Sequence, residues 1–183
     1  RKILVVSVLV LIMLSPNSFA AGDAGVDVNP EGDEPFTVIE RTTPSVDKET
    51  WSLTIEMSQE AHDNGTTFKI VTQICTNDGV CDPPVTQDVT VDGATHTTSL
   101  TPPNDHSYVN WRVKAVYEDD TTDYFPYGSW YTVWSSCYYA DGSYYGPDVD
   151  GDGCAQDEED TPGFTLIPAI AAIGLAIAVA RRD

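Results

Sequence analysis

The sequence lacks most of the residues and motifs on which enzyme chemistry depends. It has three histidines in 183 residues and no C-x-x-C pair, so a zinc site of a common type is not expected. A G-x-S-x-G nucleophile elbow, an H-E-x-x-H helix and a glycine-rich phosphate loop are also absent from it. Acidic residues are so numerous that no carboxylate pair stands out. The sequence therefore predicts a protein that is not an enzyme.

Basic residues are also scarce. Nine Lys and Arg stand against 29 Asp and Glu, which gives a formal net charge of −20. Four of the nine lie at the extreme ends, at Arg1, Lys2, Arg181 and Arg182. A surface this acidic repels nucleic acid and attracts cations. Dense acidity also suits a salty medium, where screening limits self-repulsion. We expect most of these charges to serve solubility, and we expect no nucleic-acid partner.

One stretch near the C-terminus has no charge at all. It runs from Phe164 to Ala180 and is followed by Arg181-Arg182-Asp183. At 1.5 Å per residue, roughly 17 residues span about 26 Å, the short end of what crosses a bilayer core. Its apolar residues point to every side of a helix, unlike those of a buried helix in a soluble protein. The stretch predicts a transmembrane helix with the arginines in the cytoplasm and the preceding chain outside.

The residues before this helix make the prediction more specific. Acidic residues lead into Pro162-Gly163-Phe164, the apolar helix and the terminal arginine pair. Over residues 162–183 this order resembles the PGF-CTERM sorting signal of archaeal surface proteins. The resemblance implies an archaeosortase-like enzyme that cleaves near the tripeptide, after which a lipid replaces the helix. Proline and glycine suit such a site because they keep its backbone out of the helix. A plain transmembrane anchor is the alternative.

The N-terminus has the features of a secretory signal peptide. Arg1-Lys2 precedes an apolar run from Ile3 to Leu14, and small residues at Ser18 and Ala20 mark a cleavage site after Ala20. The run is short for a membrane span, so cleavage is expected rather than an uncleaved anchor. Together with the C-terminal segment, this predicts an exported cell-surface protein anchored in the plasma membrane with its domain outside.

Between these ends, apolar and polar residues alternate with the period of two that is typical of β-strands. The clearest run is 51–57, further runs lie at 36–40, 68–74, 85–91, 109–117 and 131–133, and a weaker one lies at 95–100. In the run 85–91, Val85, Val89 and Val91 are expected on one face. No helical period is visible in this part. About seven strands with turn residues between them predict an all-β protein, an antiparallel two-sheet sandwich.

The second half of this region carries a further resemblance. Leu100 comes just before a proline turn, and Tyr108 is followed by Val113-Lys114-Ala115. This order resembles the corner between the fifth and sixth strands of fibronectin type III domains. The resemblance implies an immunoglobulin-like or fibronectin III-like sandwich over about residues 36–137, with Trp51 in its core, and it implies little about function. Tyr108 is out of phase with Val113, so either a bulge lies between them or Tyr108 faces outward.

These predictions divide the chain into five parts. They are a signal peptide (1–20), a disordered acidic linker (21–35), the β-sandwich (36–137), an acidic stalk (138–161), and the sorting signal with its transmembrane helix (162–183).

Four cysteines in an exported domain predict two disulfides. Cys75 and Cys81 flank an Asn-Asp-Gly turn and are therefore expected to pair with each other. Cys137 is then expected to pair with Cys154. Four cysteines allow three connectivities, and proximity in the sequence is the reason for choosing this one.

The acidic stalk matches a calcium-loop pattern. Residues 148–159 follow D-x-D-x-D-G-x5-E, which supplies the oxygen ligands that calcium needs. Because Gly146-Pro147 excludes a regular helix before it, the loop resembles dockerin or thrombospondin-type loops rather than an EF-hand. Such extracellular sites are weak, with dissociation constants of roughly 10⁻⁴ to 10⁻³ M. A solvated acidic spacer is the alternative. The expected ligands are Asp148, Asp150, Asp152, the Cys154 carbonyl, Gln156 (directly or through water) and bidentate Glu159.

Aromatic residues gather towards the end of the predicted sandwich. Tyr127, Trp130 and Trp134 are candidates for a ligand face, because exposed tyrosine and tryptophan favour interfaces. The alternative is that these rings fill the core. Separately, Asn64-Gly65-Thr66 is a glycosylation sequon in a polar turn.

The sequence therefore predicts a non-enzymatic, anchored surface protein with a structural or adhesive role. Its expected partners are the membrane, the processing enzyme and other surface proteins or glycans. The alternative is a carbohydrate-binding accessory module of an extracellular polysaccharide-degrading system.

Overall fold

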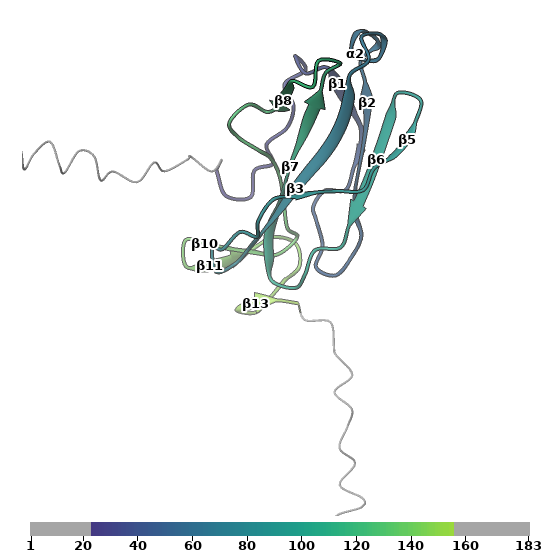
Figure 1. The fold of residues 1–183 in the computed structure, drawn as a ribbon. Helices are drawn as coiled ribbons and strands as arrows, with labels where there is room; N and C mark the ends of the chain where they lie inside the picture. Colours follow the sequence, from purple (N-terminus) through teal and green to yellow (C-terminus); the bar gives the residue numbers. More distant parts are fainter. Residues whose placement is uncertain (1–22, 156–183) are drawn as a thin grey trace, which may run out of the picture.

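Two antiparallel β-sheets form the body of the molecule (Figure 1). The computed structural model describes residues 23–155. One sheet has the strand order β1-β2-β6-β5, and the other has the order β4-β3-β7-β8 with β9 also paired to β7. The prediction of an all-β, antiparallel protein is therefore confirmed. The strands are β1 (Phe36–Arg41), β2 (Trp51–Met57), β3 (Thr67–Thr76), β4 (Val85–Thr86), β5 (Thr90–Asp92), β6 (Thr95–Leu100), β7 (His106–Val116), β8 (Thr122–Phe125) and β9 (Tyr131–Trp134).

The core lies between the two sheets and is built by alternation along the strands. On β2, the buried residues are every second one, beginning with Trp51, and on β7 the buried row includes Trp111 and Val113. Trp51 and Trp111 are each at most 1% exposed. Fully burying a large apolar side chain contributes about 1.5–3 kcal/mol, so these two rows hold the sheets together. The predicted runs 51–57 and 109–117 are therefore confirmed as strands whose alternate apolar residues face the core.

The predicted strand over residues 85–91 is wrong. Val85 lies in β4, which pairs with β3, whereas Val91 lies in β5, which pairs with β6 in the other sheet. The segment therefore crosses from one sheet to the other. Val85 and Val91 are 53% and 57% exposed, and Val89 packs against the core. A period of two shows that a segment is extended, but it does not show which sheet each part joins.

One short helix, α2 (Gln59–Asp63), joins β2 to β3, although the sequence suggested none. Ser58 caps it by accepting a hydrogen bond from the Ala61 amide, and Ala61 is buried. Five residues are too few to produce a visible helical period. Among residues 23–155, no helix is long and apolar enough to cross a membrane.

Residues 23–35 differ from the disordered linker that their composition suggested. Val28 and Thr132 of β9 exchange two backbone hydrogen bonds, of 3.0 and 3.1 Å. Asp27 forms an ion pair with Arg41 at 3.0 Å, and Glu34 accepts a hydrogen bond from the Tyr131 hydroxyl at 2.7 Å. The acidic side chains have specific donors on the sandwich. Composition reports the number of charges but not these partners.

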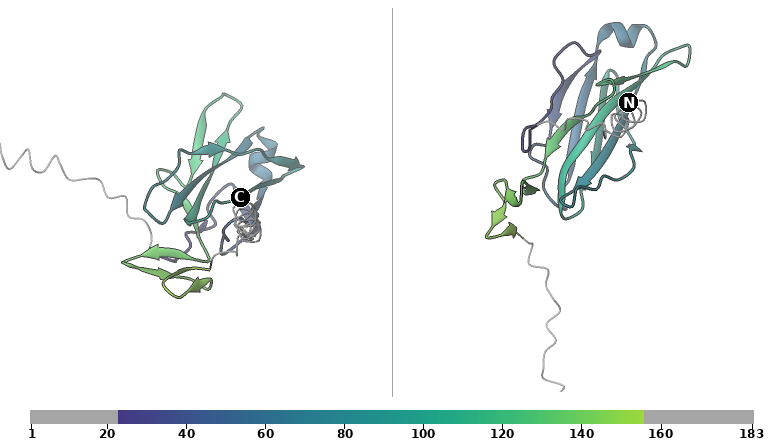
Figure 2. Two further views of the ribbon diagram at one scale, coloured as in Figure 1. Left: turned by 90° about the horizontal axis from the view of Figure 1, so that it is seen from below. Right: turned by 90° about the vertical axis from the view of Figure 1, so that its left-hand side faces the viewer.

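Two small hairpins follow β9 at the end of the sandwich opposite α2 (Figures 1 and 2). The first is β10 (Tyr138–Ala140) with β11 (Ser143–Tyr145), and the second is β12 (Val149–Asp150) with β13 (Gly153–Cys154). Gly146 between them has φ +114°, and a Cβ there would lie 2.1 Å from the Ser136 carbonyl oxygen. A glycine is therefore required where the hairpins turn back onto the sandwich.

Candidate functional site

The outer face of the five-stranded sheet is the most distinctive surface of the described chain. Strand β7 lies at its centre and pairs with β3, β8 and β9. Its residues Tyr108, Arg112 and Lys114 are partly exposed and alternate with buried residues, so they lie on the outer face. The strand also has a register shift between its pairs Tyr108–Cys75 and His106–Thr76. Thus Tyr108 faces outward, and the extra residue, Ser107, lies before it.

Arg112 contacts two aromatic rings. Its guanidinium carbon lies 4.1 Å from the centre of the Trp130 ring and 4.2 Å from that of Tyr124. Such contacts contribute from about 0.5–1 kcal/mol at exposed sites to about 2 kcal/mol when water is excluded. Among the described residues, no carboxylate pairs with this arginine, and its Nε is buried without a hydrogen-bond partner. The rings fix the position of the charge but do not neutralise it.

Two lysines extend this cationic surface. Lys69 of β3 lies directly opposite Lys114 of β7, and the Lys114 amine is 5.7 Å from the centre of the Tyr124 ring. Neither lysine has an ion pair with a residue in the range 23–155. Like charges directly opposite each other destabilise a sheet. This arrangement is unexpected in a chain with 29 acidic residues, and we refer to Lys69, Arg112 and Lys114 together as the cationic cluster.

The three predicted ligand-face aromatics lie in different environments. Tyr127 is 91% exposed, whereas Trp130 stacks on Arg112. Trp134 packs between Tyr108 and Tyr138, with ring centres 4.9 and 4.6 Å away. Trp130, just before β9, and Trp134, its last residue, lie on the outer side of the sheet, while Tyr131 between them enters the core. The ligand face stays a prediction, and it lies beside the cationic cluster.

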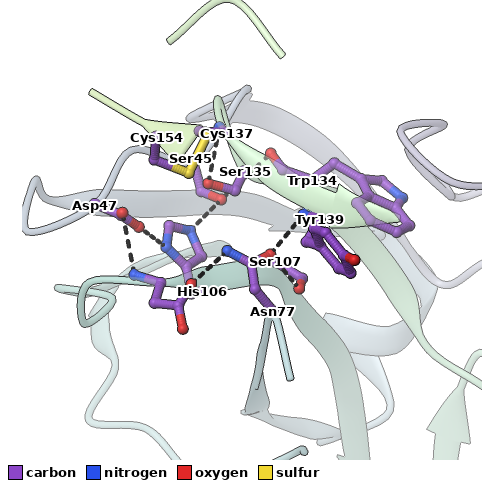
Figure 3. Close-up of polar contacts among 11 residues, drawn as sticks. Ser45, Asp47, Asn77, His106, Ser107, Trp134, Ser135, Cys137, Tyr139 and Cys154 are labelled. Carbon is purple, nitrogen blue, oxygen red and sulfur yellow. Dashed lines mark hydrogen bonds and ion pairs between the residues drawn. A yellow bond between two sulfur atoms is a disulfide. The ribbon is translucent and has the colours of Figure 1, made fainter. Parts of the chain in front are cut away.

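A buried hydrogen-bonded chain lies near the opposite end of β7 (Figure 3). His106 contacts Ser45 Oγ through Nε2 at 2.8 Å and Asp47 through Nδ1. Asp47 also accepts a hydrogen bond from the Asp105 amide at 3.1 Å. Ser45 and His106 are both 0% exposed. The loop between β1 and β2 is thereby fastened to the start of β7.

The order of contacts is that of a Ser-His-Asp triad, but the surroundings differ from those of a catalytic site. A nucleophile needs access to a substrate and donors around the developing oxyanion. Here Ser45 is enclosed, and the group 3.3 Å from its hydroxyl is the Trp134 carbonyl, an acceptor. Burial lowers the pKa of His106, and the hydrogen bond and charge of Asp47 oppose this shift. In this arrangement the three residues act as a clasp between distant segments, and we call them the histidine clasp.

Asn77 extends the clasp towards the hairpins (Figure 3). Its side-chain oxygen accepts hydrogen bonds from Ser107 Oγ and from the Tyr139 amide, both at 2.8 Å. Its amide nitrogen donates to Asp105 at 2.7 Å. Sequence reasoning found neither Asn77 nor the clasp, because their partners are far apart along the chain. The one available signal was a histidine at the start of a strand whose core-facing row from Val109 to Ala115 is apolar.

The described part of the predicted calcium loop is a β-hairpin. Strands β12 and β13 pair Val149 with Cys154, and the Ala155 amide donates to the Asp148 carbonyl at 2.8 Å. The predicted ligands Asp148, Asp150, Asp152 and Cys154 lie on this hairpin. Within residues 23–155, no three His, Cys, Asp or Glu residues form a group suited to a metal ion. Gln156 and Glu159 lie outside the described residues, and the calcium site stays a prediction.

The remaining predicted residues fall in three places. Both expected disulfides are present, Cys75–Cys81 and Cys137–Cys154. Asn64 is exposed at the end of α2, where its side-chain oxygen accepts a hydrogen bond from Thr66 at 2.6 Å; its glycosylation stays a prediction. The signal peptide, the sorting motif Pro162-Gly163-Phe164 and the apolar segment after it lie outside the described residues.

Comparison with known proteins finds no protein-family model that matches this chain and no curated protein with a significant match.

Proposed function

We propose that this chain is an exported cell-surface protein, anchored by its C-terminal segment, whose β-sandwich has a structural or adhesive role. The observation that carries this proposal is the pair of disulfides in the described domain. Disulfides persist in oxidising surroundings and are rare in the cytosol. Signal-peptide and anchor patterns at the two ends of the sequence support the same placement.

We also propose that the sandwich is of the immunoglobulin-like or fibronectin III-like type. Two antiparallel sheets enclose a shared core, to which one sheet contributes Trp51 and the other contributes Trp111. This arrangement agrees with that architecture. Such a scaffold presents loops and sheet faces to partners and hosts many unrelated roles. Its proposed partners are the membrane, an archaeosortase-like processing enzyme, and other surface proteins or glycans.

A second candidate is a carbohydrate-binding accessory module for extracellular polysaccharide degradation. The observation in its favour is the loop between β8 and β9, where Tyr127 is 91% exposed and Trp130 contacts Arg112 of the outer sheet face. Exposed aromatic rings of this kind are frequent at binding surfaces.

The anchor is tested by the intact mass of the protein isolated from washed membranes. If residues 162–183 are a sorting signal, we expect a mass that lacks residues from about Phe164 onward and includes a lipid. A mass that retains Arg181-Arg182-Asp183 would indicate a plain transmembrane anchor, which also agrees with the proposed surface location. Recovery of the whole protein in the soluble fraction, with neither lipid nor helix, would contradict the anchor.

We further propose that the acidic stalk binds calcium weakly, because the ligand spacing of residues 148–159 is complete. Calorimetry on the full chain in detergent is expected to show saturable heat that the Asp148→Ala and Asp152→Ala variants lose. Asp92→Ala, which removes an acidic residue from β5, serves as the control. If the wild-type chain gives no saturable heat up to about 10 mM calcium, well above the expected range, the site does not exist.

A further inference from the structure

The cationic cluster contains three of the five basic residues found between residues 23 and 155. The other two are Arg41, which pairs with Asp27 at 3.0 Å, and Lys48 in the loop between β1 and β2. Acidic side chains outnumber basic ones throughout the chain, yet within the described part none pairs with Lys69, Arg112 or Lys114. We propose that this cluster binds a polysaccharide whose sugars carry carboxylate or sulfate groups.

Arg112 has the geometry for recognising such an anion. The ring centres of Tyr124 and Trp130 lie 4.2 and 4.1 Å from its guanidinium carbon. Its Nε is buried, whereas its two terminal nitrogens are not among the buried unpartnered atoms. A planar fork fixed in this way presents two parallel donors to a carboxylate or sulfate group. Because the side chain is already immobilised, less entropy is lost when a ligand binds.

Lys69 and Lys114 supply additional charge next to this fork. The two lysines are cross-strand partners, and Lys114 follows Arg112 by two residues on the same face of β7. Side chains two apart on a strand are separated by about 6.5–7 Å, so the cluster spans a distance comparable to one sugar unit. The repulsion between the lysines is relieved when an anion lies between them. The unliganded sheet therefore carries a cost that a negatively charged ligand removes.

The neighbouring residues favour a sugar over an acidic peptide. Below the cluster, the partly exposed Gln73 and Thr132 place an amide and a hydroxyl group on the sheet face, and both are hydrogen-bonded to the buried Asn110. Beside it, Tyr127 is 91% exposed on the loop that also carries Trp130. An amphipathic ring of this kind packs against the apolar face of a sugar while its hydroxyl stays in water. A flat face with charge, polar groups and an exposed ring matches an acidic glycan.

The place of the cluster in the fold agrees with an adhesive role. Lys69 lies near the start of β3, which follows α2, and Lys114 pairs with Tyr124 of β8. In Figure 1, α2 and β8 are at the end opposite β10–β13, after which the described chain ends. The cluster therefore lies towards the end of the sandwich opposite the one from which the chain leads to the proposed C-terminal anchor. At about 0.15 M salt, charges more than about 8 Å away are largely screened, so acidic residues beyond that distance have little effect on the cluster.

The test is calorimetry on the full chain in detergent at about 0.15 M salt. The probes are an oligogalacturonate, a heparin-derived oligosaccharide, a neutral galactose oligomer of equal length and a polyglutamate peptide. We expect saturable binding of at least one of the two anionic oligosaccharides and of neither other probe. The Lys69→Gln/Lys114→Gln double variant is expected to weaken binding roughly tenfold or more. Arg112→Lys is also expected to weaken it, because lysine lacks the fork.

Lys48→Gln, a similar loss of charge outside the cluster, is the matched control and is expected to leave the affinity unchanged. Thermal melting of each variant verifies that it is folded. Four results would overturn the proposal: no saturable binding of either anionic oligosaccharide up to about 1 mM, equal binding of the neutral oligomer, equal binding of polyglutamate, or an unchanged affinity in the folded double variant. The inference relies on the proposed surface location, but the mass measurement tests that location independently of any ligand.

Discussion

The His106→Ala variant is expected to lose about 2–4 kcal/mol of unfolding free energy, because it combines a cavity with the loss of buried hydrogen bonds. His106 is 0% exposed and joins Ser45 to Asp47. Without the imidazole, the Ser45 hydroxyl keeps one contact, to the Trp134 carbonyl at 3.3 Å. The loop between β1 and β2 then loses its side-chain contacts with β7 and keeps the hydrogen bond from the Asp105 amide to Asp47. Urea denaturation at pH 7.5 measures the loss.

The same residue makes stability depend on pH. Burial lowers the pKa of His106 below its ordinary value of 6.5, although Asp47 opposes the shift. The unfolded chain therefore takes up a proton at a higher pH than the folded chain does. Stability is greatest above pH 6.5 and falls as the pH drops through 6.5 towards the pKa of the folded state. His106→Ala removes this contribution, so its unfolding free energy is expected to change less between pH 7.5 and 5.5.

His62→Ala is the matched control for both measurements. Its side chain is 54% exposed on α2, and a surface substitution of this kind usually changes stability by at most about 0.5 kcal/mol. A loss below about 0.5 kcal/mol for His106→Ala, within the range of ordinary surface changes, would mean that the histidine clasp does not stabilise the fold.

Removing the Cys137–Cys154 disulfide through a double alanine variant is expected to cost about 3 kcal/mol, from the loop-entropy relation for a loop of this size. The two cysteines are 17 residues apart, and Cys137 is 3% exposed at the end of the sandwich. The bridge ties β13 to the segment after β9. Without it, both hairpins have more freedom in the unfolded chain, which favours unfolding. Denaturant unfolding without reductant gives the difference.

The Cys75→Ala/Cys81→Ala variant is the comparison, since that bridge closes a loop of six residues. A shorter loop constrains the unfolded chain less, so a smaller loss is expected. If removal of Cys137–Cys154 leaves the unfolding free energy unchanged, the two hairpins do not unfold together with the sandwich. Peptide mapping that joined Cys75 to Cys137 would contradict both pairings.

The candidate site was predictable only in part. The alternation around Tyr131 placed Trp130 and Trp134 on one side of β9, and both lie on the outer face of the sheet. Nothing in the sequence pattern singled out Arg112, because the two rings that it contacts belong to β8 and to the loop before β9. Cross-strand neighbours depend on register, and register is set by turns and bulges that alternation does not encode.

The sequence by itself determined the features that depend on residues close together along the chain. Alternation at 51–57 and 109–117 determined an all-β protein and the faces of its central strands. Short spacing and a turn between Cys75 and Cys81 determined the pairing of the cysteines. Each of these rests on residues that are close along the chain, where the backbone geometry is fixed by the local sequence.

Only the tertiary structure decided the features that join distant segments. It divided residues 85–92 between two sheets and placed residues 26–34 against β1 and β9. It also brought Ser45 to His106, which is 61 positions away, and set Lys69 opposite Lys114. The physical reason is that such pairs depend on how two sheets bury a shared core. The same alternating pattern fits several strand orders, and packing selects one of them.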